Sequence, residues 1–269
     1  MTPAAPLLLV LLIQTPPPAA TAAPIADNSF LIEEAYNQER GVVQHISNFT
    51  RDWSEGGWAY AFTQEWPLNP APKHQLSYTV SMLSSGDNSG TGAGDVWVNW
   101  RYQLMSGDRV AIAPRVSVSL PAGSARASRG TGGTGVEAAL PLSALLSSRV
   151  VAHWNLVGTY FPGAKDTQLD RAHTLGFRAG QSVIFQARPR FNTMLEAVFS
   201  RQQSVIGPKA TEWSSSFILN PGIRWSYDRP SGLQIVPGIG VPITFASGSS
   251  TDAALFLYLS FEHPFGRTR

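Results

Sequence analysis

The stretch GDVWVNWRYQLM, residues 94–105, alternates apolar and polar side chains along its length. Its apolar members are Val96, Val98, Trp100, Tyr102 and Leu104, and its polar members are Asp95, Asn99, Arg101 and Gln103. Successive side chains of a strand point to opposite faces, so a period of two predicts a β-strand with one apolar and one polar face.

The same alternation recurs in segments of about ten residues, separated by clusters of Gly, Pro, Ser and Asp. Clear examples are HQLSYTVSM (74–82), RVAIAPRVSVSL (109–120) and GLQIVPGIGVPI (232–243). No segment shows convincing helical periodicity. The predicted strands are 41–51, 57–66, 74–84, 94–105, 109–120, 135–146, 149–161, 173–187, 190–201, 213–227, 231–244 and 253–265.

Alternation alone fits two folds, a soluble β-sandwich whose apolar face is the core and a membrane barrel whose apolar face meets lipid. The connection lengths favour the barrel. Short connections such as SS (147–148) and RP (188–189) alternate with long ones such as PAGSARASRGTGGT (121–134) and QQSVIGPKATE (202–212). Short periplasmic turns opposite longer outer loops are typical of outer-membrane proteins. The sequence therefore predicts an all-β protein, an antiparallel transmembrane β-barrel of about 12 strands. An exported soluble β-sandwich binding protein is an alternative.

The composition and the N-terminus indicate export. Charged residues make up 14% of the 269 residues, well below about 25% in a soluble domain, and Cys is absent, so no disulfide can form. The apolar run PLLLVLLI (6–13) followed by AATAAP (19–24) predicts a cleaved signal peptide at 1–22. We expect a periplasmic or plug-like segment at 23–40, the barrel at 41–265, a short tail at 266–269, and a location in the Gram-negative outer membrane.

The last predicted strand suggests an assembly partner. ALFLYLSFEHPF (254–265) resembles the C-terminal signal by which the barrel-assembly machinery recognises outer-membrane proteins. Other expected partners are outer-membrane lipid, lipopolysaccharide and small solutes; Arg126, Arg129 and Lys165 in the long loops could contact the lipopolysaccharide. A pI near 9.0 is compatible with nucleic-acid binding, but the predicted signal peptide and the dispersed arginines argue against it, so we expect no nucleic-acid partner.

Two runs carry a family resemblance. NSFLIEEAYNQERGVVQHISNF (28–49) resembles the opening of a family of outer-membrane β-barrel transporters associated with the MetA pathway of phenol degradation. NPGIRWSYDRPSGLQIVPGIGVPI (220–243) is similar to the penultimate hairpin of that family. The resemblance implies a channel or transport role for small, aromatic or hydrophobic compounds. It carries over no catalytic or binding residues.

Polar and charged residues on the predicted inner faces are the candidate lumen lining. They are His45, Asp95, Asn99, Arg101, Arg115, Glu137, His153, Arg178, Glu196, Arg224 and Glu262. Charges of both signs inside a small barrel can brace the wall in pairs, or they can line a path that selects solutes. No ring of a single sign stands out, and both interpretations stay open.

A hydrolase is the enzymatic alternative. His45-Ile46-Ser47-Asn48 resembles the core of an outer-membrane phospholipase, in which Ser is the nucleophile and His the base. We expect His45, Ser47 and Phe49 on the lumen face of the first strand, away from lipid, so we predict no enzyme and no catalytic residue. The histidines are scattered, and the Gly-rich loops lack a phosphate-binding motif, so we expect neither a metal nor another cofactor. Closure of the barrel should pair this first strand with strand 253–265.

Overall fold

The computed structural model describes residues 28–54, 56–68, 70–71, 73–84, 86, 90–247 and 251–265. The predicted signal peptide and the C-terminal tail lie outside these residues. Within them, no helix is long and apolar enough to cross a membrane. The regular structure is β-strand, apart from the short 3-10 helix η1 (Ala125–Ala127).

The strands of the described chain share one sheet. They are β1 (Val42–Asp52), β2 (Trp58–Pro67), β3 (His74–Ser84), β4 (Gly92–Ala93), β5 (Val96–Tyr102), β6 (Met105–Ser106), β7 (Val110–Ile112), β8 (Arg115–Leu120), β9 (Gly135–Ser147), β10 (Val150–Lys165), β11 (Arg171–Arg188), β12 (Phe191–Gly207), β13 (Ala210–Trp225), β14 (Tyr227–Asp228), β15 (Gln234–Gly240), β16 (Ile243–Ala246) and β17 (Asp252–Pro264).

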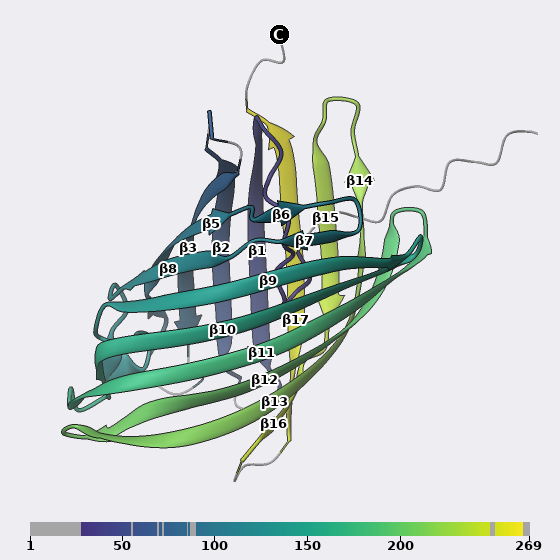
Figure 1. The fold of residues 1–269 in the computed structure, drawn as a ribbon. Helices are drawn as coiled ribbons and strands as arrows, with labels where there is room; N and C mark the ends of the chain where they lie inside the picture. Colours follow the sequence, from purple (N-terminus) through teal and green to yellow (C-terminus); the bar gives the residue numbers. More distant parts are fainter. Residues whose placement is uncertain are drawn as a thin grey trace, which may run out of the picture.

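The sheet closes on itself into an antiparallel barrel of 12 wall strands, as predicted. Strand β1 pairs with β2 on one side and with β17 on the other, from Val42 opposite Pro264 to Asp52 opposite Ala254 (Figure 1). The expected pairing of the first and last strands is therefore confirmed. Closure leaves no strand edge exposed at this seam.

Two wall strands consist of two segments with a proline at the break. Pro114 separates β7 from β8, and Pro242 separates β15 from β16. Proline has no backbone N–H to donate to a neighbouring strand. The short segments continue the wall, since β7 and β8 both pair with β9, and β15 and β16 both pair with β13 and β17.

One predicted loop is wrong. Residues 202–212 extend the hairpin of β12 and β13, and only Pro208 and Lys209 connect the two strands. Ser204 pairs with Glu212 and Val205 with Thr211, so the ladder continues through polar residues. A membrane strand needs about 9–11 residues, and β12 has 17 residues, so the hairpin is long enough to extend beyond the bilayer. Figure 1 shows β10 to β13 as long, strongly tilted ribbons.

The wall is apolar outside and polar inside, which is the reverse of a soluble sandwich. Along β8, Val116 is 48% exposed, whereas Arg115, Ser117 and Ser119 are buried. The same alternation holds along β9, where Val136 and Leu140 are exposed and Glu137 is buried. An apolar outer face requires lipid, because water would not stabilise it. The sandwich alternative is wrong, since the enclosed face is the polar one.

Aromatic side chains gather near both rims of the wall. At the rim that holds Val42 and Pro264, here called the terminal rim, His74 packs against Trp100 and Tyr102. Near the opposite, loop rim, Phe49 stacks on Trp58 and Phe177 on Trp213. Aromatic girdles at both membrane interfaces are typical of outer-membrane barrels.

Candidate functional site: the plugged barrel interior

The N-terminal segment (residues 28–41) occupies the barrel interior before the chain enters β1. Its Ala35 is fully buried, and Ile32 is 2% exposed. Phe30 forms an apolar core with inner-face residues of β1, β11, β12, β15 and β17, and the residues of this cluster are Ile46, Ile184, Met194, Val236, Phe256 and Tyr258. The barrel therefore folds around a small hydrophobic core of its own.

The backbone of the N-terminal segment forms no ladder with the wall, so side chains accept its hydrogen bonds. Glu196 Oε1 accepts from the N–H of Leu31 at 2.8 Å and from the N–H of Ile32 at 3.1 Å. Asn155 accepts from the N–H of Glu33 and Ser143 from that of Ala35. Gln103 accepts from the N–H of Asn37, and Gln75 accepts from that of Gln38. Buried backbone donors require such partners, so these contacts fix the path of the segment.

Glycines of β13 and β15 make room for the Phe30 ring. A Cβ on Gly238 would lie 2.6 Å from the ring, and a Cβ on Gly222 would clash with Phe30 Cε2. Both approaches are shorter than van der Waals contact. A side chain at Gly222 or Gly238 would therefore clash with the Phe30 ring.

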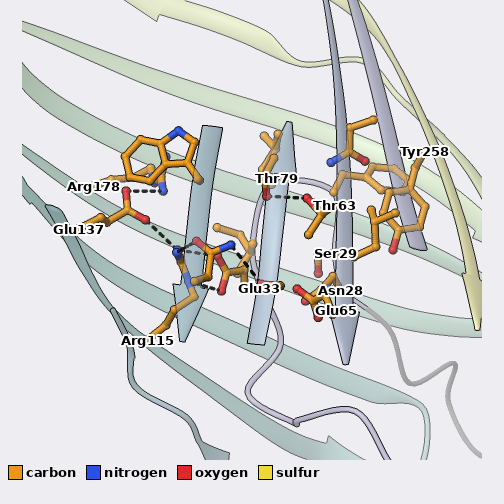
Figure 2. A pocket seen from close by; sticks show the side chains of 18 residues that line it. Asn28, Ser29, Glu33, Thr63, Glu65, Thr79, Arg115, Glu137, Arg178 and Tyr258 are labelled. Carbon is orange, nitrogen blue, oxygen red and sulfur yellow. Dashed lines mark hydrogen bonds and ion pairs between the residues drawn. The ribbon is translucent and has the colours of Figure 1, made fainter. Parts of the chain in front are cut away.

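A cluster of charged side chains binds Glu33 to the wall (Figure 2). Arg101 Nη2 donates to Glu33 Oε2 at 2.8 Å. Arg115 Nε donates to the same oxygen at 3.0 Å, and Arg115 Nη2 lies 2.8 Å from Glu33 Oε1. Arg115 Nη2 also donates to Glu137 Oε1 at 2.7 Å, and Arg178 Nη2 lies 3.7 Å from Glu137 Oε2. The Arg115–Glu33 pair is bidentate, which is the strongest form of this interaction.

The two arginines keep Glu33 ionised. Burial by itself raises the pKa of the Glu33 carboxyl, but the attraction and hydrogen bonds of Arg115 and Arg101 outweigh it and lower that pKa to about 2. Glu33 therefore carries a full negative charge inside the barrel at neutral pH.

The N-terminal segment separates two cavities. A cavity of about 370 Å³ on its loop side, here called the loop-side cavity, is lined by Phe30, Glu33, Trp97, Arg178 and Tyr258, among others. A cavity of about 530 Å³ on its terminal side, the terminal-side cavity, is lined by Glu34, Gln38 and Glu262, among others. The lumen is thus divided at the segment.

The structure places most of the predicted lumen residues on the inner face. Those that contact the N-terminal segment are Arg101, Arg115, Glu196, Arg224 and Glu262. Others bind wall or loop groups: Asn99 contacts Ser77, Glu137 contacts Arg115, His153 contacts Ser143, and Asp95 accepts from Gly123 and Thr131. Arg178 differs, because its side chain is 47% exposed.

The prediction for His45 is wrong. His45 lies on the outer face of β1, where its Nε2 is 3.3 Å from His263 Nε2 and its ring stacks on Phe62. The inward residues of β1 are Gln44, which accepts from Gln38, and Ile46, which packs in the core around Phe30. The inner face of β1 packs against Phe30 of the N-terminal segment and is therefore partly apolar. For this reason the more polar face of β1, which carries His45, does not point into the lumen.

The predicted orientation of Ser47 and Phe49 is wrong for the same reason, and this removes one argument against a hydrolase. Ser47 shares the outer face with His45. Its Oγ lies 3.1 Å from Tyr60 Oη, however, and the Nε2 of His45 is beside His263. Ser47 and His45 therefore have different partners and do not form a nucleophile–base pair. Among the described residues, no group of three or more His, Cys, Asp or Glu side chains could hold a metal ion.

The sequence analysis missed the neutral acceptors that bind the N-terminal segment. They are Gln44, Gln75, Gln103, Ser143 and Asn155. Gln75, Gln103, Ser143 and Asn155 stand at polar positions of the alternating pattern, so the period of two places them on the inner face, whereas Gln44 stands on the face of β1 that was predicted to point outward. Nothing in the pattern shows that they would bind the N-terminal segment and not solvent.

The comparisons with known proteins agree with the fold. No family model matches the sequence, and no curated protein matches it. An outer membrane channel from Pseudomonas putida F1 superposes with a TM-score of 0.60 at 9% identity, over 85% of this chain and 97% of that one. The NanC porin superposes with a TM-score of 0.55 at 12% identity, over 81% and 98%. The KdgM porin gives 0.50 at 8% identity, over 81% and 98%. At these identities the likeness is one of fold: the chain is built like these outer-membrane barrels.

Proposed function

We propose that this protein is an outer-membrane channel for small solutes, narrowed by its own N-terminal segment. The single observation that carries the proposal is a closed wall, apolar outside and polar inside, whose lumen holds a cavity on each side of residues 28–41. The channel and porin names of its structural neighbours support it. A lumen filled to this degree favours slow, selective passage over wide, unselective diffusion.

We propose small aromatic or hydrophobic molecules as solutes. The resemblance of 28–49 and 220–243 to the MetA-associated transporter family supports this class. The loop-side cavity supports it as well, because Phe30, Trp97 and Tyr258 contribute aromatic surface to a space of about 370 Å³. Cavities that bind small molecules begin at about this size.

We propose that the protein lies in the bacterial outer membrane, where such a channel would act. The chain would cross the inner membrane with its signal peptide (1–22), which is then removed. The barrel-assembly machinery would recognise strand β17, and Arg126, Arg129 and Lys165 would contact lipopolysaccharide. Heat-modifiable migration of the membrane fraction on a gel tests this route, and recovery in the soluble periplasmic extract would contradict it.

Planar bilayers test the channel. Protein refolded in detergent should give discrete conductance steps, or flux of a small aromatic solute in a liposome assay. A folded, heat-modifiable barrel that gives neither would overturn the proposal. The hydrolase alternative requires a lipase or esterase activity that Ser47→Ala abolishes, and an inactive native protein would exclude it.

A further inference from the structure

Acidic and basic side chains both surround the loop-side cavity. Five charged residues line it: Glu33, Glu65, Glu137, Arg115 and Arg178. Arg101, which binds Glu33, completes the set with a third guanidinium. Of these charged residues, only Glu33 belongs to the N-terminal segment and not to the wall. If Glu33 moved away, the three guanidinium groups would therefore face one carboxylate fewer.

Two of the arginines have donor capacity that the protein does not use. Arg178 reaches Glu137 only at 3.7 Å, and its side chain is 47% exposed. The Nε of Arg101 is buried and has no hydrogen-bond partner among the described residues. A buried donor without an acceptor is costly, which applies to Arg101 Nε, whereas the exposed donors of Arg178 are accessible to a solute that enters the cavity. Arg101 and Arg178 could therefore each bind a further hydrogen-bond acceptor near Glu33.

The group already bound there identifies the ligand chemistry. The Glu33 carboxylate receives two hydrogen bonds from Arg115 and one from Arg101, so the wall arginines are spaced for a carboxylate. The same cavity is also lined by the aromatic residues Phe30, Trp97 and Tyr258. The apolar part of a small molecule could pack there while its charged end lies at the arginines.

We propose that Arg101, Arg115 and Arg178 form a carboxylate-binding site of the barrel interior, that Glu33 is its resident occupant, and that a small aromatic carboxylate competes with Glu33 for it. This inference rests on the proposed function, since it names the solute class of the same lumen. Arg178 is the first contact, because it faces the cavity and is the most exposed of the three. A solute carboxylate that replaces Glu33 restores the missing carboxylate, and the departure of Glu33 loosens the N-terminal segment.

Calorimetric binding of benzoate to the refolded full chain in detergent tests the inference. Benzamide, which has nearly the same shape and no charge, is the control ligand. Glu33→Gln should bind benzoate about tenfold more tightly than the native chain, because the competitor is removed. Arg178→Gln should bind it about tenfold more weakly, because one charged hydrogen bond is lost.

Matched variants separate the site from general charge effects. Glu34→Gln removes a neighbouring carboxylate that lines the terminal-side cavity, and Arg201→Gln removes an arginine that lies over Trp213. Both should bind benzoate as the native chain does. Equal affinity of the native chain, Glu33→Gln and Arg178→Gln would overturn the inference, and so would benzamide binding that matches benzoate.

Folding and function are checked apart from binding. If Glu33→Gln does not give a heat-modifiable barrel, the binding of benzoate to Arg178→Gln decides. Among the described residues, the ion pair of Arg178 is with Glu137 of the wall and is long, at 3.7 Å, so its loss should not disturb the N-terminal segment. Binding is measured without a membrane. A barrel that binds benzoate but never conducts would support the carboxylate-binding site and contradict the proposed channel. A barrel that conducts but does not bind benzoate in this way would support the channel and contradict the site.

Discussion

Glu33 and Glu34 are consecutive residues, yet they line different cavities of the same barrel. Glu33 borders the loop-side cavity and is held by Arg101 and Arg115, whereas Glu34 borders the terminal-side cavity. The division between the two spaces is therefore only one or two residues thick at this point. A partition this thin, held by side-chain contacts, can be removed by small changes to those side chains.

Deletion of residues 28–38 should raise single-channel conductance several-fold. The deletion removes Phe30, Glu33 and the backbone that separates the cavities, while β1 and its pairing with β17 remain. Planar-bilayer recordings of the native and shortened chains measure the effect. Heat-modifiable migration shows that the shortened barrel is closed. Unchanged conductance of a closed barrel would mean that the segment does not block the path.

Acid should loosen the N-terminal segment through Glu33. The pKa of this carboxyl is about 2 when the segment is docked, below the ordinary value of 4.5. Because the docked pKa is lowered, the contribution of Glu33 to docking is complete above about pH 4.5 and is lost as the pH falls towards 2. The difference in conductance between the native chain and Glu33→Gln should therefore shrink over this range.

The control for the acid experiment is Glu34→Gln. The difference in conductance between Glu34→Gln and Glu33→Gln should shrink with falling pH just as the difference between the native chain and Glu33→Gln does. Other carboxylates also titrate at low pH, so the measured quantity is the difference between variants and not the conductance of one chain. A difference that stays constant down to pH 2 would contradict the role of Glu33.

Replacement of Glu196 should release the turn at Leu31 and Ile32. Glu196→Ala leaves two buried N–H groups without an acceptor, at a cost of roughly 1–3 kcal/mol each. Glu196→Gln retains a carbonyl oxygen and should have a smaller effect. Hydrogen exchange of the Leu31 and Ile32 amides in the folded barrel measures the release. Equal protection in the native and Ala chains would show that Glu196 is not needed.

A methyl group on Gly238 should displace Phe30. Its Cβ would lie 2.6 Å from the ring, too close for any rotamer that leaves the ring in place. Gly238→Ala should therefore raise conductance, and the same change in a Phe30→Ala background should add little. Gly158→Ala is the matched control, because nothing lies within 4 Å of its Cβ. Additive effects in the double variant would contradict direct contact.

Most of the wall could be predicted from the sequence because a closed barrel in lipid enforces one rule along every strand. Val116, Ser117 and Val118 alternate in the sequence and alternate outside, inside and outside in the structure. The seam of β1 and β17 was also predictable, since a barrel has to close. The extension of β12 and β13 through residues 202–212 could not be predicted. The polar residues there are typical of a loop, but a strand with polar side chains can also continue into water beyond the membrane.

The sequence by itself determined the class of fold, the positions of most strands and the polar character of the lumen, because each depends on local alternation and on the need to satisfy backbone groups in lipid. Only the tertiary structure decided what fills that lumen. The placement of Phe30 turns Ile46 inward and His45 outward, and the pairing of Glu33 with Arg101 and Arg115 joins residues far apart in the chain. Such contacts depend on three-dimensional closure around an irregular segment, and no periodicity of the sequence records them.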